Sequence, residues 1–242
     1  MNHSNQRWAC RLWRNRNGVA MIEFAAVLPF MLLLFFGGIE LTRYILITQR
    51  VEAGAQMLAS VASQYPPATQ NPSADGQLSQ SELANNVFPL LTRILEPCQT
   101  SNCAGQFASN AVHPDYVSIL TSFRREGNQT RIKWQMGGGG SLGGVTSQIS
   151  GLGPSNPPSA SARNRVVSFA DAEMSALANA MEPNENLIAA EIFYSYQPAF
   201  AGLLGTLGFA IQPTQLYRAA YVSPRNGELI CLPPTFTYSE CS

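Results

Sequence analysis

Charged side chains are scarce in this 242-residue chain. Only 12% of its residues are charged, whereas Gly, Pro, Ser, Asn and Gln are plentiful. This composition is typical of a secreted or surface protein rather than of a highly charged cytosolic enzyme. The first 18 residues hold four arginines and no acid, so the remainder carries 11 basic and 15 acidic side chains. A mildly acidic remainder lacks the basic face that phosphate binding requires, and nucleic acid is therefore not an expected partner.

Histidine is nearly absent, which argues against hydrolytic chemistry. Beyond the first 18 residues, His113 is the only histidine in the sequence. Hydrolysis usually needs a positioned base, and no nucleophile-elbow pattern accompanies this histidine. The glycine-rich stretch at residues 137–158 lacks the Lys-Ser/Thr ending of a phosphate-binding loop. The sequence therefore predicts no enzyme, no catalytic residues and no cofactor.

One long apolar run stands out against this polar background. About 20 nearly uninterrupted apolar residues, 19–39, are enough to cross a bilayer core as a helix. Basic residues close to a span favour the cytoplasmic side. We therefore expect a single-pass inner-membrane protein with a cytoplasmic N-terminus and a periplasmic or extracellular C-terminal domain. The arginines that set this orientation are Arg7, Arg11, Arg14 and Arg16.

A single carboxylate, Glu23, lies near the start of this run. A charge so close to the hydrocarbon costs a few kcal/mol on insertion scales, which indicates a function and a cationic partner. Cleavage after Gly18 would create an α-amino group on Val19, about one helical turn from Glu23. That amine, from the same chain or from a neighbour, is the expected partner.

Four residues in Gly-Val-Ala-Met-Ile-Glu-Phe-Ala-Ala-Val-Leu-Pro, namely Gly18, Glu23, Phe24 and Pro29, resemble the N-terminal signature of TadE-like proteins. These are pseudopilins of the tight-adherence system, which builds Flp-type pili. The resemblance implies that a membrane prepilin peptidase cleaves after the glycine and that the glutamate acts in assembly. It also implies partners among other pilin-like subunits and the pilus assembly machinery. Residues 185–198 look similar to a strand near the C-terminal end of such domains.

Two other interpretations of the N-terminus stay open. An ordinary secretory signal peptide would need a small-residue cleavage site after the apolar run, and Phe36-Gly37-Gly38 is not an Ala-x-Ala pattern. Alternatively, the helix is an uncleaved anchor. The chain would then be a single-pass membrane protein whose outer domain binds envelope or surface components.

Cysteine usage agrees with the expected topology. Cys10 lies in the leader and would be lost on cleavage. The four remaining cysteines would face an oxidising compartment: Cys98, Cys103, Cys231 and Cys241. Three pairings are possible, and proximity in sequence favours joining the first two and the last two. In the alternative, some stay reduced. Their spacings do not match those of paired zinc knuckles, so no metal site is predicted.

Hydrophobic periodicity predicts an α+β fold with three parts. These are a leader at 1–18, a transmembrane and protruding amphipathic helix at 19–65, and an extracytoplasmic domain at 66–242. Pro29 is expected to kink the helix, and Pro66-Pro67 to end it. An apolar seam on its outer half would face either the chain's own domain or neighbouring subunits: Leu41, Tyr44, Thr48, Val51, Ala55, Leu58, Ala62 and Tyr65.

The outer domain is predicted to contain a small antiparallel sheet. Its elements are a helix at 81–96, a hairpin of strands 116–123 and 129–136, a helix at 168–181 and strands 187–196 and 215–222. The Gly/Ser/Pro-rich stretch at 137–158 reads as a flexible loop. Basic residues at the hairpin end are either solvated or a docking patch: Arg124, Arg125, Arg131 and Lys133.

Overall fold

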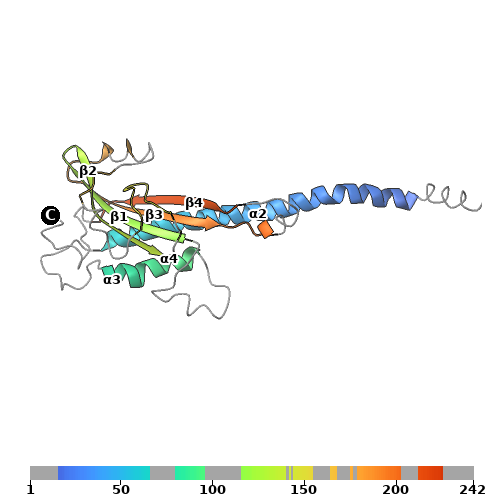
Figure 1. Cartoon of the computed structure of the whole chain (residues 1–242), viewed down its shortest axis with the longest axis horizontal. Helices are drawn as coiled ribbons and strands as arrows, with labels where there is room; N and C mark the ends of the chain where they lie inside the picture. The colour runs from blue at the N-terminus through green and yellow to red at the C-terminus, as the bar shows by residue number, and fades with distance from the viewer. Residues whose placement is uncertain are drawn as a thin grey trace, which may run out of the picture. The chain divides into compact units, whose positions relative to one another are not determined.

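A computed structural model describes residues 16–65, 80–95, 116–139, 142, 144–154, 164–167, 175–176, 179–202 and 212–225. The fold is α+β, as predicted (Figure 1). The chain divides into two compact units, Met1–Ile45 with Pro198–Ile211, and Leu46–Gln197 with Gln212–Ser242. The elements in chain order are α2 (Arg16–Gln64), α3 (Gln80–Glu82), the π-helix η1 (Leu83–Val87), α4 (Phe88–Leu95), β1 (Tyr116–Glu126), β2 (Gln129–Gly139), β3 (Asn186–Tyr196) and β4 (Thr214–Val222).

Helix α2 continues without a break from the apolar run into the second unit. Its 49 residues correspond to about 74 Å at 1.5 Å per residue. Pro29 lies inside the helix and does not interrupt it; the kink expected there stays a prediction. The helix ends just before Pro66-Pro67, because neither proline can supply a backbone N–H to continue it.

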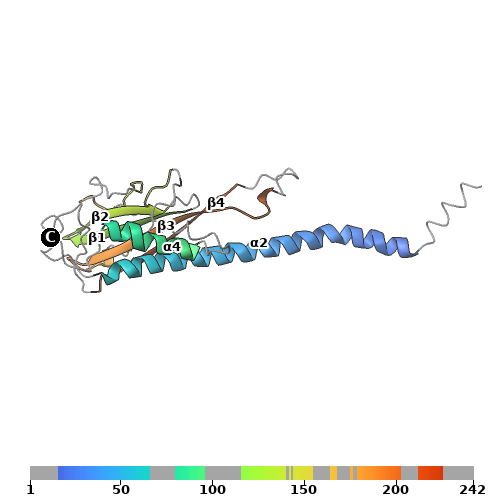
Figure 2. The same ribbon diagram turned by 90° about the horizontal axis from the view of Figure 1, so that it is seen from below.

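The second unit is built on a four-stranded antiparallel sheet with the order β2-β1-β3-β4. The C-terminal part of α2 and the helix α4 pack on one face of the sheet (Figure 2). The apolar seam turns inward here, since Val51, Ala55, Leu58 and Ala62 are all buried. Leu41, by contrast, is 60% exposed. The part of the seam from Val51 onwards therefore packs against the chain's own domain.

Both faces of the sheet are covered. Alternate residues of β1 point to opposite sides, so Tyr116 and Leu120 pack with the helices. Val117 and Ile119 pack on the other side with Val145. The expectation of a flexible loop at 137–158 is wrong for its first residues, because Gly137, Gly138 and Gly139 belong to β2. Further along, Val145 and Ile149 are buried parts of the core.

The helix predicted from Ser81 onwards contains a π-helical turn. The Phe88 N–H bonds the carbonyl of Leu83, five residues earlier. Pro89 follows directly; it has no N–H and its ring clashes with the preceding turn of a regular α-helix, so the wider turn accommodates it. The predicted apolar stripe is buried at Leu83, Val87, Leu91 and Leu95. Leu90 is exposed.

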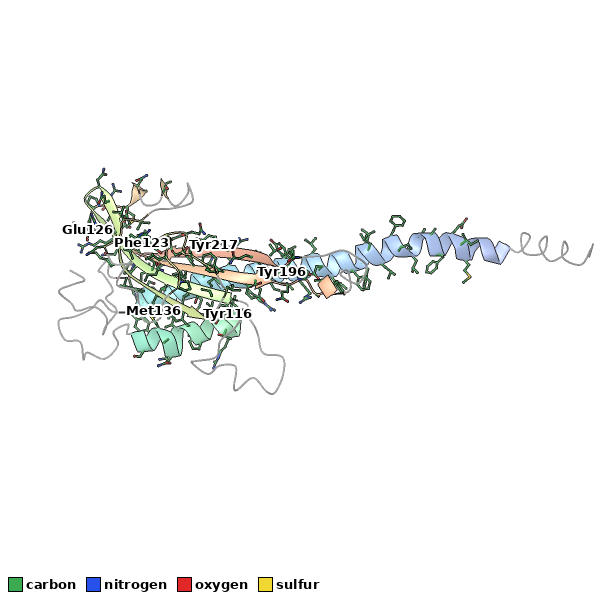
Figure 3. All side chains as sticks on the ribbon, in the orientation of Figure 1. Tyr116, Phe123, Glu126, Met136, Tyr196 and Tyr217 are labelled. Carbon is green, nitrogen blue, oxygen red and sulfur yellow. The ribbon has the colours of Figure 1, made fainter. Side chains whose placement is uncertain are left out.

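The hairpin is longer than predicted, and its basic end serves the fold. Glu126 lies at the hairpin end labelled in Figure 3. Its carboxylate pairs with Lys133 Nζ at 2.5 Å and with Arg131 Nε at 3.5 Å. The Arg125 guanidinium donates to the carbonyls of Asn179 and Met181 at 2.6 and 2.7 Å. Arg125, Arg131 and Lys133 therefore have partners within the chain, and docking by this end of the hairpin stays a prediction.

Candidate assembly and processing site

The N-terminal half of α2 exposes apolar side chains all along its length. Met21 is 76% exposed, Ile22 71% and Phe24 61%. The helix from Ala20 onwards is long and apolar enough to cross a membrane, and its most apolar stretch is not buried in the protein. Figure 3 shows side chains projecting from this half of the helix in several directions. In water such a surface would be strongly unfavourable, which points to lipid or other apolar helices as its surroundings.

The residues of the predicted cleavage site lie in the first turn of α2. Gly18 and Val19 have helical backbone conformation. Glu23 follows Val19 by four residues, a spacing that places both on one face of a helix. Glu23 is exposed, and within the described part of the chain no basic group lies within 4.0 Å of its carboxylate. Among the described residues this acid therefore has no cationic partner, which would be costly at the edge of a hydrocarbon layer.

Farther along the same helix, the surface beside two glycines is open. A Cβ added at Gly37 or Gly38 would meet no atom within 4 Å. Small residues on an apolar helix allow a second helix to approach closely. Pro29 and Phe24 lie on the same uncovered stretch.

The C-terminal end of this apolar stretch carries a polar contact that was not expected from the sequence. The backbone N–H of Ala199 donates to both carboxylate oxygens of Glu40, at 3.1 and 3.3 Å. Beside this contact, the rings of Phe36 and Phe200 lie 4.9 Å apart between centroids. One signal was available in the sequence, because Glu40 is the first charged residue after Glu23.

Residues 18–60 match the family model described as TadE-like protein. This segment of the chain is TadE-like. The match begins at Gly18 and contains Glu23, Phe24 and Pro29, so the resemblance predicted from these residues is confirmed. It is consistent with a TadE-like pilin of the tight-adherence system. No curated protein and no solved structure matches the chain.

The TadE-like segment covers the exposed half of α2 and most of its buried half. It does not reach residues 185–198, where a second resemblance was noted. That stretch does form strand β3, as predicted. The four cysteines proposed as disulfide partners, Cys98, Cys103, Cys231 and Cys241, lie outside the described residues, as does His113.

A buried acid outside the TadE-like segment was also missed. Glu191, in the middle of β3, is fully buried and accepts hydrogen bonds from the Ser147 hydroxyl, the Gln148 N–H at 2.8 Å and the Tyr217 hydroxyl at 3.2 Å. Burial raises the pKa of Glu191, and these hydrogen bonds partly oppose the shift. Because both carboxylate oxygens of Glu191 accept hydrogen bonds from other residues of the same domain, we assign Glu191 a structural role.

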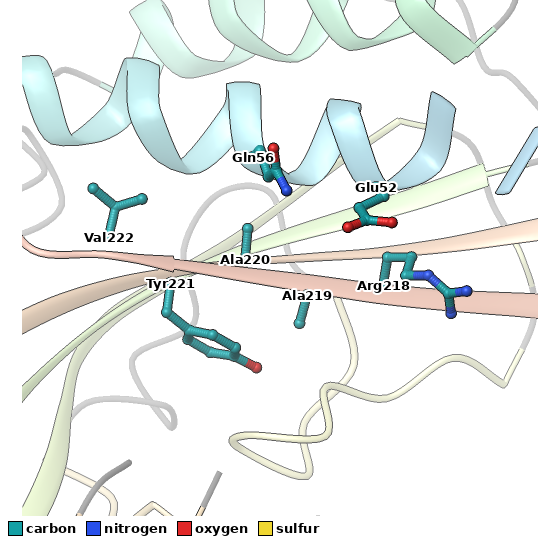
Figure 4. A pocket seen from close by; sticks show the side chains of 7 residues that line it. All are labelled: Glu52, Gln56, Arg218, Ala219, Ala220, Tyr221 and Val222. Atoms are coloured by element: carbon teal, nitrogen blue, oxygen red, sulfur yellow. The ribbon is translucent and has the colours of Figure 1, made fainter. Parts of the chain in front are cut away.

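A groove lies between α2 and β4 in the second unit (Figure 4). Its volume is about 450 Å³. Glu52 and Gln56 of α2 face Arg218 and Ala220 of β4 across it. This set offers no paired nucleophile and base, and within the described ranges no three His, Cys, Asp or Glu side chains gather as a metal site would require. The groove therefore carries no catalytic assignment.

Proposed function

We propose that this chain is a membrane-anchored minor pilin or pseudopilin that takes part in assembling an Flp-type pilus for adherence or secretion. The observation that carries the proposal is the TadE-like match beginning at Gly18, on a helix whose apolar surface is uncovered. In this proposal the N-terminal half of α2 spans the inner membrane, with the arginine-bearing leader in the cytoplasm. The domain built on the four-stranded sheet lies on the periplasmic or extracellular side.

Processing is the first step of the proposed mechanism. A prepilin peptidase cuts after Gly18 and leaves a protonated α-amino group on Val19. The peptide bond to be cut lies in the first helical turn of the intact chain. Only the last few residues before the span need to unwind for cleavage, because a helix end has few backbone hydrogen bonds to lose.

Neutralisation of Glu23 is the second step. The new amine, on the same chain or on a neighbour, pairs with the Glu23 carboxylate while Phe24 and the apolar residues around it pack against like helices. A subunit out of register would leave a charge unpaired in a lipid environment, at a cost of several kcal/mol. This penalty favours one register over its alternatives. Partners are thus the membrane, the peptidase, other pilin-like subunits and the assembly machinery.

Determination of the mature N-terminus tests the proposal most directly. The protein would be purified from membranes of cells that contain the peptidase and analysed by mass spectrometry of its N-terminal peptide. We expect the chain to begin at Val19. A chain that begins at Met1 would overturn the proposal and favour an uncleaved single-pass protein whose outer domain binds envelope or surface components.

A further inference from the structure

The connection between β3 and β4 is far longer than a hairpin needs. β3 ends at Tyr196 and β4 begins at Thr214, whereas adjacent antiparallel strands are commonly joined by two to five residues. Most of this connection does not group with the sheet. Pro198–Ile211 instead belongs to the same compact unit as the first half of α2. The excess length therefore groups with the apolar helix rather than with the sheet.

Two contacts fix where the described part of this connection meets the helix. Glu40 accepts the Ala199 N–H with both oxygens, at 3.1 and 3.3 Å. The Phe200 ring packs against Phe36 with centroids 4.9 Å apart and planes inclined by 56°. Arg43 lies on the outer side of Glu40, with its guanidinium 4.0 Å from the same carboxylate. Two consecutive residues thus make contacts of different kinds with the helix. Ala199 contacts the charged Glu40, and Phe200 contacts the apolar Phe36 one turn earlier.

These two contacts correspond to the expected boundary between water and hydrocarbon. No charged residue lies between Glu23 and Glu40, so Glu40 marks the outer end of the apolar stretch. Phe36 is one helical turn, about 6 Å, closer to the N-terminus. Because the Phe200 ring packs on Phe36, it lies on the apolar side of this boundary. Phenylalanine rings occur on the lipid-facing side of segments that lie in the membrane interface.

We propose that Phe200 and its neighbours Ala201 and Gly202 rest on the outer lipid surface, with the Phe200 ring at the boundary between headgroups and acyl chains. The proposal rests on the membrane insertion of α2 proposed above. In sequence the stretch continues to Ile211 without a charged residue, which is compatible with an apolar surface. Glu40 acts as the positioning residue, since its carboxylate holds Ala199 at the level of the interface.

The consequence is a second membrane contact besides the span. A single helix leaves the outer domain free to tilt and to rotate about the helix axis, whereas a second apolar anchor restricts both motions. The subunit would have to withdraw Phe200 from lipid when it leaves the bilayer for a filament.

The test measures the depth of residue 200 in a bilayer. Full-length protein carrying Phe200→Trp would be reconstituted in phosphatidylethanolamine/phosphatidylglycerol vesicles containing lipids brominated at either a shallow or a deep acyl position. Trp8 and Trp13 are replaced by phenylalanine, and the fully buried Trp134 is retained as a constant background. We expect shallow bromines to quench the introduced tryptophan more than deep bromines do.

Two matched positions separate this proposal from the one on which it rests. Leu33→Trp, in the exposed apolar stretch of α2, should be quenched most by deep bromines, and Val166→Trp, exposed in the second unit, should not be quenched. Quenching at Leu33 without quenching at Phe200 would overturn the lipid contact and leave membrane insertion intact. Absence of quenching at both positions would overturn both proposals.

A further variant tests the role assigned to Glu40. Glu40→Ala removes the acceptor of the Ala199 N–H, and combined with Phe200→Trp it should reduce the shallow quenching. If the shallow quenching of residue 200 is unchanged in this double variant, Glu40 does not position Ala199. If quenching at residue 200 instead disappears as the protein-to-lipid ratio rises, a second copy covers Phe200, and a lipid contact is the wrong assignment.

Discussion

The hydroxyl of Ser147 donates a hydrogen bond to the carboxylate of Glu191, which ties residues 144–154 to the middle of strand β3. The N–H of Gln148 donates to the other carboxylate oxygen at 2.8 Å. Ser147 also accepts the N–H groups of Ile149 and Ser150, each at 3.1 Å. A single buried acid therefore organises a segment that its glycine content alone would mark as flexible.

This arrangement predicts an unusual pH dependence of stability. Burial raises the pKa of Glu191 above its unfolded value, so the folded state binds the proton more tightly. The corresponding stabilisation is fully present below the unfolded pKa, about 4.3, and is lost as the pH rises through the folded pKa. Glu191→Gln removes this titration. We expect acidification from neutral pH toward the unfolded value to stabilise the wild type relative to this variant, measured by thermal unfolding in detergent with near-ultraviolet circular dichroism.

Glu126→Gln provides a control, because the pKa of Glu126 is shifted in the opposite direction to that of Glu191 and stability should change with pH in the opposite sense. A hydrogen bond from Lys133 holds the pKa of Glu126 below its usual value. Its contribution is therefore present above the unfolded pKa and lost as the pH falls through the folded pKa. Because Glu126 is partly solvent-exposed, its effect should be small. Parallel pH profiles for wild type and Glu191→Gln would contradict the role given to Glu191.

Gly138→Ala should destabilise the domain. The ring of Phe88, from α4, packs directly on Gly138 of β2, and an added Cβ would overlap it. Overpacking of this kind typically costs about 1–3 kcal/mol. Gly153→Ala is the matched control, because its Cβ would meet only the Val145 carbonyl oxygen, at 3.7 Å. We expect that control to change the free energy of unfolding by less than about 0.5 kcal/mol in urea denaturation. Equal effects of the two substitutions would exclude the Phe88 contact as the cause.

Local patterns in the sequence were enough to predict the long helix and the four strands, although not the π-helical turn or the full length of β2. The period of the apolar residues identified α2, and alternation together with the turn at Gly127 identified the hairpin of β1 and β2. The spacing from Gly18 to Glu23 identified the TadE-like segment in the same way. Each of these signals lies within a few turns of helix or one pair of strands.

Contacts between distant parts of the chain were not predictable in this way. Glu40 and Ala199 are 159 residues apart, and Ser147 and Glu191 are 44 apart. Pairing of β1 with β3 likewise joins segments separated by strand β2 and the residues that follow it, up to position 185. Which polar groups become buried together depends on the assembled fold, so a single sequence shows an acid in a strand without showing what surrounds it.

Glu23→Leu should separate insertion from assembly. Removing the charge makes the helix easier to insert, by a few kcal/mol on insertion scales, and leaves the cleavage site intact. We expect the variant to reach the membrane and to be cut, but not to support pili, because the new amine on Val19 lacks its partner. Electron microscopy of surface pili measures the outcome. Met21→Leu, an apolar exchange at an exposed neighbouring position, should assemble normally, and normal piliation by Glu23→Leu would count against the proposed charge pair.

Gly18→Leu should block processing while leaving the span intact. A bulky side chain at the residue before the cut obstructs a peptidase that the TadE-like resemblance implies acts after glycine. In cells containing the peptidase, the variant should migrate on a denaturing gel with the precursor from peptidase-deficient cells. Gly37→Leu controls for adding a leucine to α2, since no atom would lie within 4 Å of its Cβ, and it should be cut like the wild type. If Gly18→Leu migrates with the mature wild-type protein, the cut lies elsewhere, and Glu23 then requires a different cation.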